Sequence, residues 1–494
     1  MTLTSMIVHG HFYQPPRENP WTGHIDAQPS AAPFHDWNER VHAESYRPNS
    51  IANIVSADGE RTVNNYERMS FDIGPTLLGW LERVHPRTYG RILDADATSL
   101  RALGHGNAMA QAFHHTILPL SPRHDVKTEV RWGLADFRHR FGREAEGMWL
   151  PETAVNDDVL GILIDEGVSF TVLASHQAAR WRESSGDWIE ASEGGIDTRT
   201  AYRFAHPDGS GRWMSLFFYD GGIARAIAFE HATSSAERLM DLFMSRGDGS
   251  DRVVHAATDG ETYGHHHKFG DIGLAYALFT EAARRDVATT NYATWLEHHP
   301  PQQEVQVAGG EGTSWSCAHG VGRWKEDCGC HTGGREGWNQ RWREPLRTAL
   351  EIVKRSADEA FGRLGGGLLE DPWRARDHYV EVVIGARSID DFFGEVASGP
   401  LDPHRARRAA NLLELQRNAL AMFTSCAWFF SDVSGIETVQ ILRYAQRSLE
   451  LLDEVGHAAP TGAFLAQLEL AKSNNPDAGS ARDIFESLAP ATAS

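Results

Sequence analysis

The chain has 494 residues, of which 41% are hydrophobic and 23% charged, a composition typical of a globular protein with several domains. Its formal net charge is −20, so we expect neither a nucleic-acid-binding protein nor one that binds an anionic membrane, since both need clustered positive charge. Four cysteines are too few for a secreted disulfide scaffold, and no run of residues approaches the apolar length of about 18 needed to cross a membrane. Residues 1–9 show no legible signal peptide, and we expect a cytoplasmic protein.

The first part of the chain alternates short apolar runs with helical patterns. The patterns predict strands at residues 5–9, 146–150, 169–174, 213–219 and 252–257. They predict helices at residues 72–84, 128–141 and 159–166. Such alternation is typical of βα units around a parallel sheet, and it favours one barrel with insertions over two doubly wound halves.

The second part of the chain is predicted to be helical. Helical apolar spacing recurs at residues 345–356, 375–384, 403–430, 436–455 and 462–472. Clusters of Pro, Gly and Gln at 298–312 separate it from the first part. We therefore predict a catalytic barrel at 1–300, an active-site loop and linker at 301–344, and an α-helical domain at 345–494.

Polar side chains follow several of the predicted strands. His9 and His11 are two residues apart at the end of the first strand, so both rings can face one pocket. Glu152 comes directly after a strand and Pro151, and Asp259 ends the strand at 252–257. Because a parallel barrel builds its active site at the carboxyl ends of its strands, these residues are candidates for one site. A metal pair or ordinary polar rim residues remain alternatives for the two histidines.

Two carboxylates from different strand ends suit the cleavage of a glycosidic bond. One carboxylate attacks or activates water while the other protonates the departing oxygen. Histidine, Asp and Glu can bind sugar hydroxyls, and Trp and Tyr can stack on the apolar faces of a sugar.

Three motifs together resemble the conserved regions of glycoside hydrolase family 57. They are His9-Gly-His11 with Gln14-Pro, Trp149-Leu-Pro-Glu152, and Asp259-Gly-Glu261-Thr-Tyr-Gly-His265. The resemblance implies a (β/α)7-type barrel followed by helices, and retaining action on α-glucans. It also implies Glu152 as nucleophile and Asp259 as general acid/base, with His9 and His11 at the −1 subsite.

Further residues are assigned to the substrate site by the same resemblance. Residues 313–324 resemble the family's fifth conserved region, and we expect this loop to close over the barrel mouth. Residues 104–119 match the family's second region more loosely, since the usual acidic residue is absent there, and His114 or His115 is carried over on this looser match alone. The expected substrate-binding residues are His9, His11, Gln14, Trp149, Glu261, His265, Trp315, His319 and Trp324.

The rest of the chain is similar to a subgroup of that family. The segments 327–330, 371–377 and 423–430 resemble members that carry a C-terminal helical domain of unknown function.

Three cysteines near the linker leave a metal site open. Cys317, Cys328 and Cys330 with either His319 or His331 would suffice for tetrahedral zinc, although their spacing is not that of a standard zinc knuckle. Reduced buried thiols are the simpler interpretation, and His331 is the fourth ligand if His319 binds sugar.

The sequence thus predicts a retaining enzyme that acts on an α-glucan or maltooligosaccharide and needs no cofactor. Hydrolysis of the amylase type, 4-α-glucanotransfer and branching all remain open, because the acceptor depends on how wet the closed site is. One alternative is a non-catalytic glucan-binding protein. Another is a zinc-dependent carbohydrate hydrolase that uses His9, His11 and residues 265–267.

Overall fold

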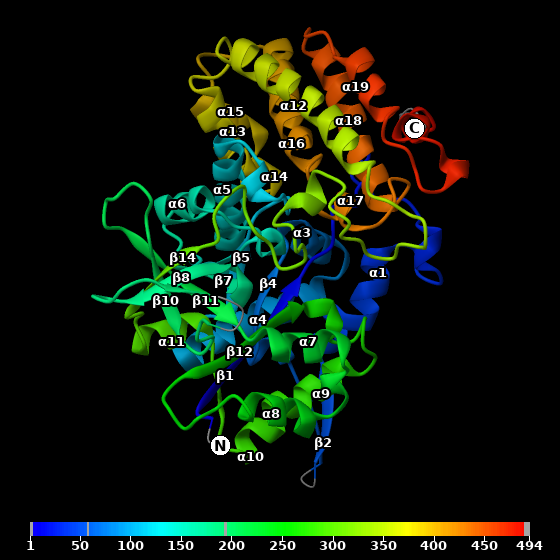
Figure 1. Cartoon of the computed structure of the whole chain (residues 1–494). Coiled ribbons are helices and arrows are strands. Elements are labelled where there is room, and N and C mark those ends of the chain that lie inside the picture. The colour runs from blue at the N-terminus through cyan, green and yellow to red at the C-terminus, as the bar shows by residue number, and fades with distance from the viewer. Residues whose placement is uncertain (1–2, 57–58, 192–194, 489–494) are drawn as a thin grey trace. The chain divides into compact units, whose positions relative to one another are not determined.

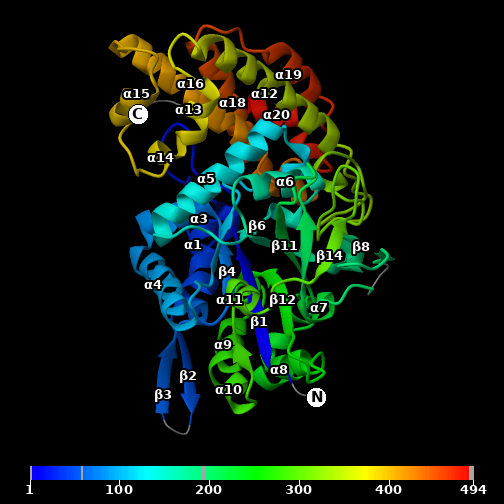
Figure 2. The same cartoon turned by 90° about the vertical axis from the view of Figure 1, so that its left-hand side faces the viewer.

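The computed structural model describes residues 3–56, 59–191 and 195–488. They form two compact units (Figures 1 and 2). The first unit comprises residues 1–14, 27–112 and 137–310, and the second comprises 15–26, 113–136 and 311–494. No helix in the described ranges is both long enough and apolar enough to cross a membrane.

Seven parallel strands of the described chain form the barrel of the first unit. Hydrogen-bonded pairing gives the order β12-β1-β4-β5-β6, and β7 pairs with β11. A parallel bridge between Gly147 and Phe170 joins the β6 and β7 ends, and the Asp220 amide donates to the His255 carbonyl between β11 and β12. The strands are β1 (Ser5–Phe12), β4 (Ser70–Ile73), β5 (Ala108–Gln111), β6 (Met148–Trp149), β7 (Phe170–Ala174), β11 (Trp213–Tyr219) and β12 (Val253–Asp259).

Helices follow the barrel strands, as expected for βα units. The helix after β4 starts where Pro75 follows Gly74, since proline fits the first helical turn. The helix after β6 is capped by the Asn156 side chain, which accepts from the Val159 amide. The helices of this unit are α1 (Trp37–Val41), α2 (Arg47–Ser50), α3 (Pro75–Val84), α4 (Pro86–Leu103), α6 (Asp157–Asp165), α7 (Gly221–Phe229), α8 (Ala236–Met244), α9 (Gly270–Tyr276), α10 (Ala282–Arg284) and α11 (Tyr292–His298).

Short strands outside the barrel extend its sheet. β10 pairs antiparallel with β11, and β14 and β8 continue outward from β10. β2 and β3 form a separate hairpin that projects from one end of the unit (Figure 2). These strands are β2 (Ala52–Ser56), β3 (Gly59–Val63), β8 (Ala178–Glu183), β9 (Ile189–Glu190), β10 (Ala201–Ala205), β13 (Ala288–Thr289) and β14 (Gln303–Val307).

The second unit is helical, and α12, α16 and α18 pack side by side in it (Figure 1). Helix α5 (Arg123–Phe141) contributes its residues up to 136. The remaining helices are α12 (Arg343–Gly365), α13 (Pro372–His378), α14 (Val380–Val383), α15 (Ile389–Val396), α16 (Pro403–Ala421), α17 (Cys426–Phe429), α18 (Ile436–Glu454), α19 (Thr461–Leu468) and α20 (Ala481–Glu486).

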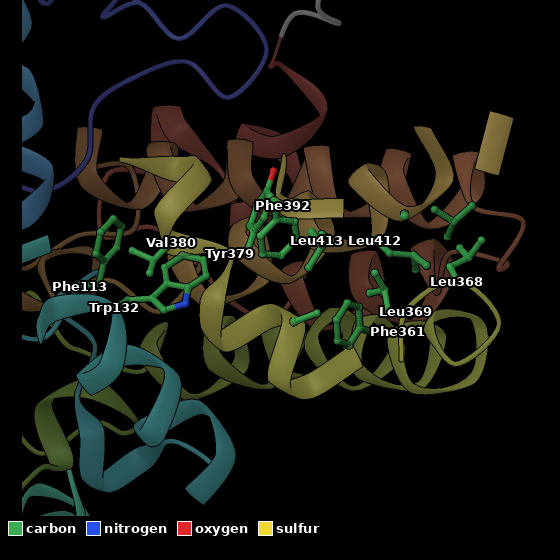
Figure 3. Packing of buried hydrophobic residues seen from close by; sticks show 13 residues of the cluster. Phe113, Trp132, Phe361, Leu368, Leu369, Tyr379, Val380, Phe392, Leu412 and Leu413 are labelled. Atoms are coloured by element: carbon green, nitrogen blue, oxygen red, sulfur yellow. The ribbon is translucent and has the colours of Figure 1, made fainter. Parts of the chain in front are cut away.

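One large hydrophobic cluster fills part of the second unit. Trp132 of α5 lies edge-on to Phe113, with ring centroids 5.3 Å apart. The cluster continues through Tyr379, Phe361 and Leu412 (Figure 3). This unit therefore has a hydrophobic core of its own.

Several predicted elements differ from the structure in a way that affects the site. The helix predicted at 72–84 is wrong at its start, because Asp72 lies in β4 and the helix begins at Pro75. The long helix predicted at 403–430 ends at Ala421 and resumes as α17, and that predicted at 375–384 divides into α13 and α14. The domain boundaries at residues 300 and 344 stay a prediction. The two compact units are each built from three separate segments of the chain.

Candidate active site

The carboxyl ends of three adjacent strands place polar residues in one row. His11 on the central strand β1 is level with Asp72 on β4 and with Asp259 on β12. His9, two residues earlier, is level with Ser70. The strand register therefore brings the two predicted histidines and the predicted acid/base into one cluster.

Asp72 bridges the two histidines. Its Oδ1 lies 3.0 Å from His9 Nε2, and its Oδ2 lies 2.8 Å from His11 Nδ1. The other ring nitrogen of His9 lies 3.0 Å from the Ser70 hydroxyl. All of these side chains are buried, so the three-residue cluster is held rigidly. Sequence reasoning missed Asp72 because it assigned that residue to a helix.

The two imidazoles differ in charge. Burial lowers the pKa of His9, and the Asp72 carboxylate only partly opposes this effect. Burial also acts to lower the pKa of His11, but the carboxylates of Asp72, Asp259 and Glu261 outweigh it and raise that pKa to about 9. At neutral pH the site therefore holds a neutral His9 and a cationic His11.

Trp149 supports both imidazoles. Its ring is stacked on His9 at 4.8 Å and on His11 at 5.1 Å between centroids. The indole is fully buried, so in this structure it packs on the histidines and presents no open face to a sugar. Through this stacking, Trp149 at the end of β6, just before Glu152, packs against the histidines at the end of β1.

Glu152 lies on a strained turn directly after β6. It adopts φ 57° and ψ 21°, and the next residue, Thr153, also has a positive φ of 48°. Left-handed backbone at non-glycine residues costs free energy and persists where the surroundings enforce it, often at functional sites. The carboxyl-bearing residue is buried, with 8% of its surface exposed.

Gln177 fixes this turn. Its Nε2 donates to the Thr153 carbonyl at 2.8 Å, and its Oε1 accepts from the Thr153 hydroxyl at 2.9 Å. The same oxygen accepts from the Ala174 amide at the end of β7. No motif marked Gln177 in the sequence, because its role depends on contact between two strand ends.

Asp259 occupies the exposed end of β12. The residue as a whole is exposed, whereas its carboxyl group is desolvated. This desolvation raises its pKa, which cationic His11 opposes and the Asp72 carboxylate reinforces.

Glu261 is a buried neighbour of Asp259. Its Oε1 accepts hydrogen bonds from the Tyr46 hydroxyl at 2.6 Å and from the Tyr13 amide at 3.0 Å. Burial, reinforced by Asp259, raises its pKa to about 7, although the Tyr46 bond acts in the opposite direction. Gln14, a predicted substrate-binding residue, interacts with Tyr46. Sequence reasoning did not single out Tyr46.

His265, another predicted substrate-binding residue, does not bond the Glu261 carboxylate. The His265 ring instead bonds Glu44 and lies edge-on to Trp37. His267 bonds the Ala228 carbonyl. Among the described residues, the groups whose donor atoms could share one metal ion do not include His9, His11 or residues 265–267. The donor set expected for a zinc hydrolase at the barrel is therefore not assembled.

The remaining predicted residues belong to the second unit. His114 is 2.7 Å from the Glu129 carboxylate, and His115 is 2.6 Å from the Ser425 hydroxyl. Trp324 is fully buried, which leaves its indole no face for a ligand. Trp315 is partly exposed. Closure of the loop 313–324 over the barrel stays a prediction.

The structure distinguishes the two histidines left open as a fourth metal ligand. His319 Nδ1 lies 3.5 Å from Cys330 Sγ, and its donor atom clusters with those of Cys317 and Cys328. His331, the alternative ligand, does not belong to this group. The assignment of His319 to a sugar site is therefore less well supported than its place among the thiols.

A parallel barrel with carboxyl and imidazole groups at the ends of its strands is the kind of site that carbohydrate-cleaving enzymes use. The profile described as "Glycosyl hydrolase family 57" matches residues 14–308, and the chain belongs to that family. A second profile, "Domain of unknown function (DUF3536)", matches residues 338–493. Among curated proteins, the comparison found no matching sequence.

Solved structures share the fold. An exo-type maltose-forming amylase from Pyrococcus sp. ST04 is 14% identical with a TM-score of 0.69, over 94% of this chain and 82% of that one. A GH57-type branching enzyme from Pyrococcus horikoshii is 15% identical with a TM-score of 0.56, over 99% and 98%. A 4-alpha-glucanotransferase from Thermococcus litoralis is 15% identical with a TM-score of 0.54, over 92% and 60%.

Proposed function

We propose that this family 57 member is a retaining enzyme acting on α-glucans, with Glu152 as nucleophile and Asp259 as general acid/base. The observation that carries the proposal is the strand register, in which Asp259 lies level with the Asp72–His11 pair. The strained turn of Glu152 follows Trp149, which stacks on the same histidines, and this placement supports Glu152 as the nucleophile. Named activities of the structural relatives support the substrate class.

The reaction has two steps. Glu152 attacks the anomeric carbon, the glycosidic C–O bond breaks, and Asp259 donates its proton to the departing oxygen. Asp259 then takes a proton from the acceptor, whose oxygen displaces Glu152 and restores the original anomer. A raised pKa for Asp259 suits the first step, because the acid must carry a proton near neutral pH.

The buried neighbours contribute charge and orientation. Cationic His11 lies beside Asp259 and can donate to a sugar hydroxyl or stabilise the carboxylate after proton transfer. Neutral His9 can bind a hydroxyl without adding a second buried charge. Retention further requires the Glu152 and Asp259 carboxyl groups to lie about 5–5.5 Å apart, and a separation near 9 Å in a ligand complex would indicate inversion instead.

Azide rescue tests the two roles separately. With α-glucosyl fluoride, whose leaving group needs no protonation, Glu152→Ala should regain turnover in azide and form the inverted β-azide. Asp259→Ala should form the retained α-azide, because its glycosyl-enzyme still forms. Exchanged stereochemistry would reverse the roles, and full activity of either variant without azide would remove that residue from the mechanism.

The acceptor is identified by the products. Incubation with a maltooligosaccharide of defined length should give shorter sugars if water is the acceptor. Longer or branched chains would mark transfer. If the wild-type chain binds the sugar without altering it, the protein is a glucan-binding module and the catalytic proposal is wrong. A cytoplasmic location stays a prediction.

A further inference from the structure

The second unit gathers three of the four cysteines of the chain in one place. The Sγ atoms of Cys317, Cys328 and Cys330 and one ring nitrogen of His319 lie within 4.8 Å of one another. All of the cysteines are free thiols. The fourth, Cys426 in α17, is not a member of this group.

The spacing of the donor atoms fits a tetrahedral zinc ion. Zinc bonds of about 2.3 Å to sulfur and 2.0–2.1 Å to nitrogen imply tetrahedron edges of about 3.8 Å between two sulfurs and about 3.6 Å between sulfur and nitrogen. The Cys317 and Cys328 sulfurs are 3.8 Å apart, and Cys330 Sγ is 3.5 Å from His319 Nδ1. The sulfur–sulfur distance is far above the covalent length of about 2.05 Å in a disulfide.

Two tight turns of the local backbone bring these ligands together. Gly329, between two of the cysteines, has φ +79°, and Gly320, after His319, has φ +74°. A Cβ at Gly320 would lie 2.5 Å from the Gly312 carbonyl oxygen, so this turn requires glycine.

A buried cation lies beside the group. Arg343 is fully buried, its Nη1 is 3.9 Å from Cys328 Sγ, and the same nitrogen donates to the Cys330 carbonyl at 2.8 Å. Its Nε and Nη2 have no hydrogen-bond partner, and no described carboxylate forms an ion pair with it. A buried guanidinium without a counter-charge is costly. Zinc with three thiolates and a neutral histidine carries one net negative charge, and this charge would be the counter-charge that Arg343 lacks.

We propose that Cys317, His319, Cys328 and Cys330 bind one structural zinc ion in the second unit. Four protein ligands leave no open position for water, so the ion would not take part in sugar chemistry. It would instead fasten residues 317–330 next to Arg343 at the start of α12. The proposal is independent of the glycosidase function.

Metal content of the full-length protein tests this proposal. Protein purified without added metal or chelator should contain about one zinc per chain, as measured by inductively coupled plasma mass spectrometry. X-ray absorption at the zinc edge should give three sulfur neighbours and one nitrogen. Zinc should be lost from Cys330→Ser and from His319→Ala.

Two matched variants separate the cluster from its neighbours. Cys426→Ser removes the other cysteine, and His331→Ala removes the histidine next to Cys330 in sequence; both should keep their zinc. Loss of zinc in His331→Ala with retention in His319→Ala would overturn the proposed ligand set. A Cys317–Cys328 disulfide in purified, zinc-free protein would overturn the site itself.

Cobalt keeps the test decisive if a ligand variant does not fold. Wild-type protein stripped with a chelator and then loaded with Co²⁺ should show the intense bands of tetrahedral cobalt thiolate, and zinc should abolish them. Stripping should also lower the midpoint of thermal unfolding, and zinc should restore it. Weak octahedral cobalt bands, or no cobalt uptake, would contradict the proposal.

Discussion

Asp72 bonds one neutral imidazole, His9, and one cationic imidazole, His11, and the charge on His11 makes the stability of the fold depend on pH. Because the pKa of His11 is raised from 6.5 to about 9, its proton stabilises the folded state fully below pH 6.5, and this contribution is lost as the pH rises through 9. The shift corresponds to about 3 kcal/mol at most. In denaturant titrations at pH 6 and 10, Asp72→Asn should lose most of this difference in unfolding free energy. An unchanged pH dependence would contradict the charge assignment.

The Tyr46 hydroxyl lowers the pKa of Glu261 by bonding its charged form. Tyr46→Phe should therefore raise that pKa above its value of about 7, and Glu261 should take up its proton at a higher pH. The infrared carboxylate bands of Tyr46→Phe should titrate at higher pH than those of wild type, with Glu261→Gln identifying the band. A shift toward lower pH would show that the hydrogen bond does not tune Glu261.

The left-handed backbone of Glu152 predicts a difference between two inactive variants. Glycine adopts positive φ without strain, whereas alanine does not. Glu152→Gly should therefore be more stable than Glu152→Ala by about 1 kcal/mol, the reverse of the order expected at an ordinary position. Denaturant unfolding of the two proteins measures the difference, and a more stable alanine variant would argue against the strained turn.

At the scale of elements, Gln177 couples the end of β7 to the turn after β6. Gln177→Met keeps the volume but removes all three hydrogen bonds to the turn and strand. We expect kcat to fall on the order of 100-fold, since small displacements of a nucleophile cost that much, while KM changes little. Thr153→Ser, which keeps its hydroxyl, is the control and should retain kcat. A rise in KM as large as the fall in kcat would indicate that the whole substrate site has lost its structure, and not the position of Glu152 alone.

The motif at 371–377 proves to be structural. Arg376 is buried and bonds Asp125 at 2.7 Å and Gln416 at 2.9 Å, and it also bonds the Thr128 hydroxyl. Lys354 reaches the other Asp125 oxygen at 2.9 Å. Removing Arg376 takes away one of the two buried cations that bond Asp125 and a donor to Gln416, so Arg376→Met should lower the free energy of unfolding by about 1–3 kcal/mol. A loss below about 1 kcal/mol in chemical denaturation would show that the network is dispensable.

Strand and helix patterns predicted the barrel, but not every strand that builds its site. The apolar runs at 5–9 and 252–257 are long enough to recognise, and both are barrel strands. β4 has only four residues and runs into Gly74 and Pro75, so its apolar positions merged with those of α3. The Gly-Pro step was the available signal that a helix begins there and that Asp72 precedes it.

At the scale of the whole molecule, interleaving limits what one sequence can predict. Residues 15–26 and 113–136 cluster with the second unit although both are flanked by segments of the first. The sequence separates its two parts only at residues 298–312, so composition cannot reveal such excursions. The same limit applies to Tyr46 and Gln177, whose partners lie 215 and 24 residues away along the chain. Motif residues such as Glu152 could be proposed from the sequence because the motif that marks them is local, and their roles stay a prediction.

The central claim is that Glu152 forms the covalent bond to the sugar, and trapping that bond tests it most directly. A fluorinated α-glycosyl fluoride that is transferred quickly and released slowly should leave the enzyme labelled once, with the label on the peptide that contains Glu152. Glu152→Gln should remain unlabelled and should lose about 10⁴-fold or more in kcat. A label on another carboxylate, or full turnover by Glu152→Gln, would contradict the account.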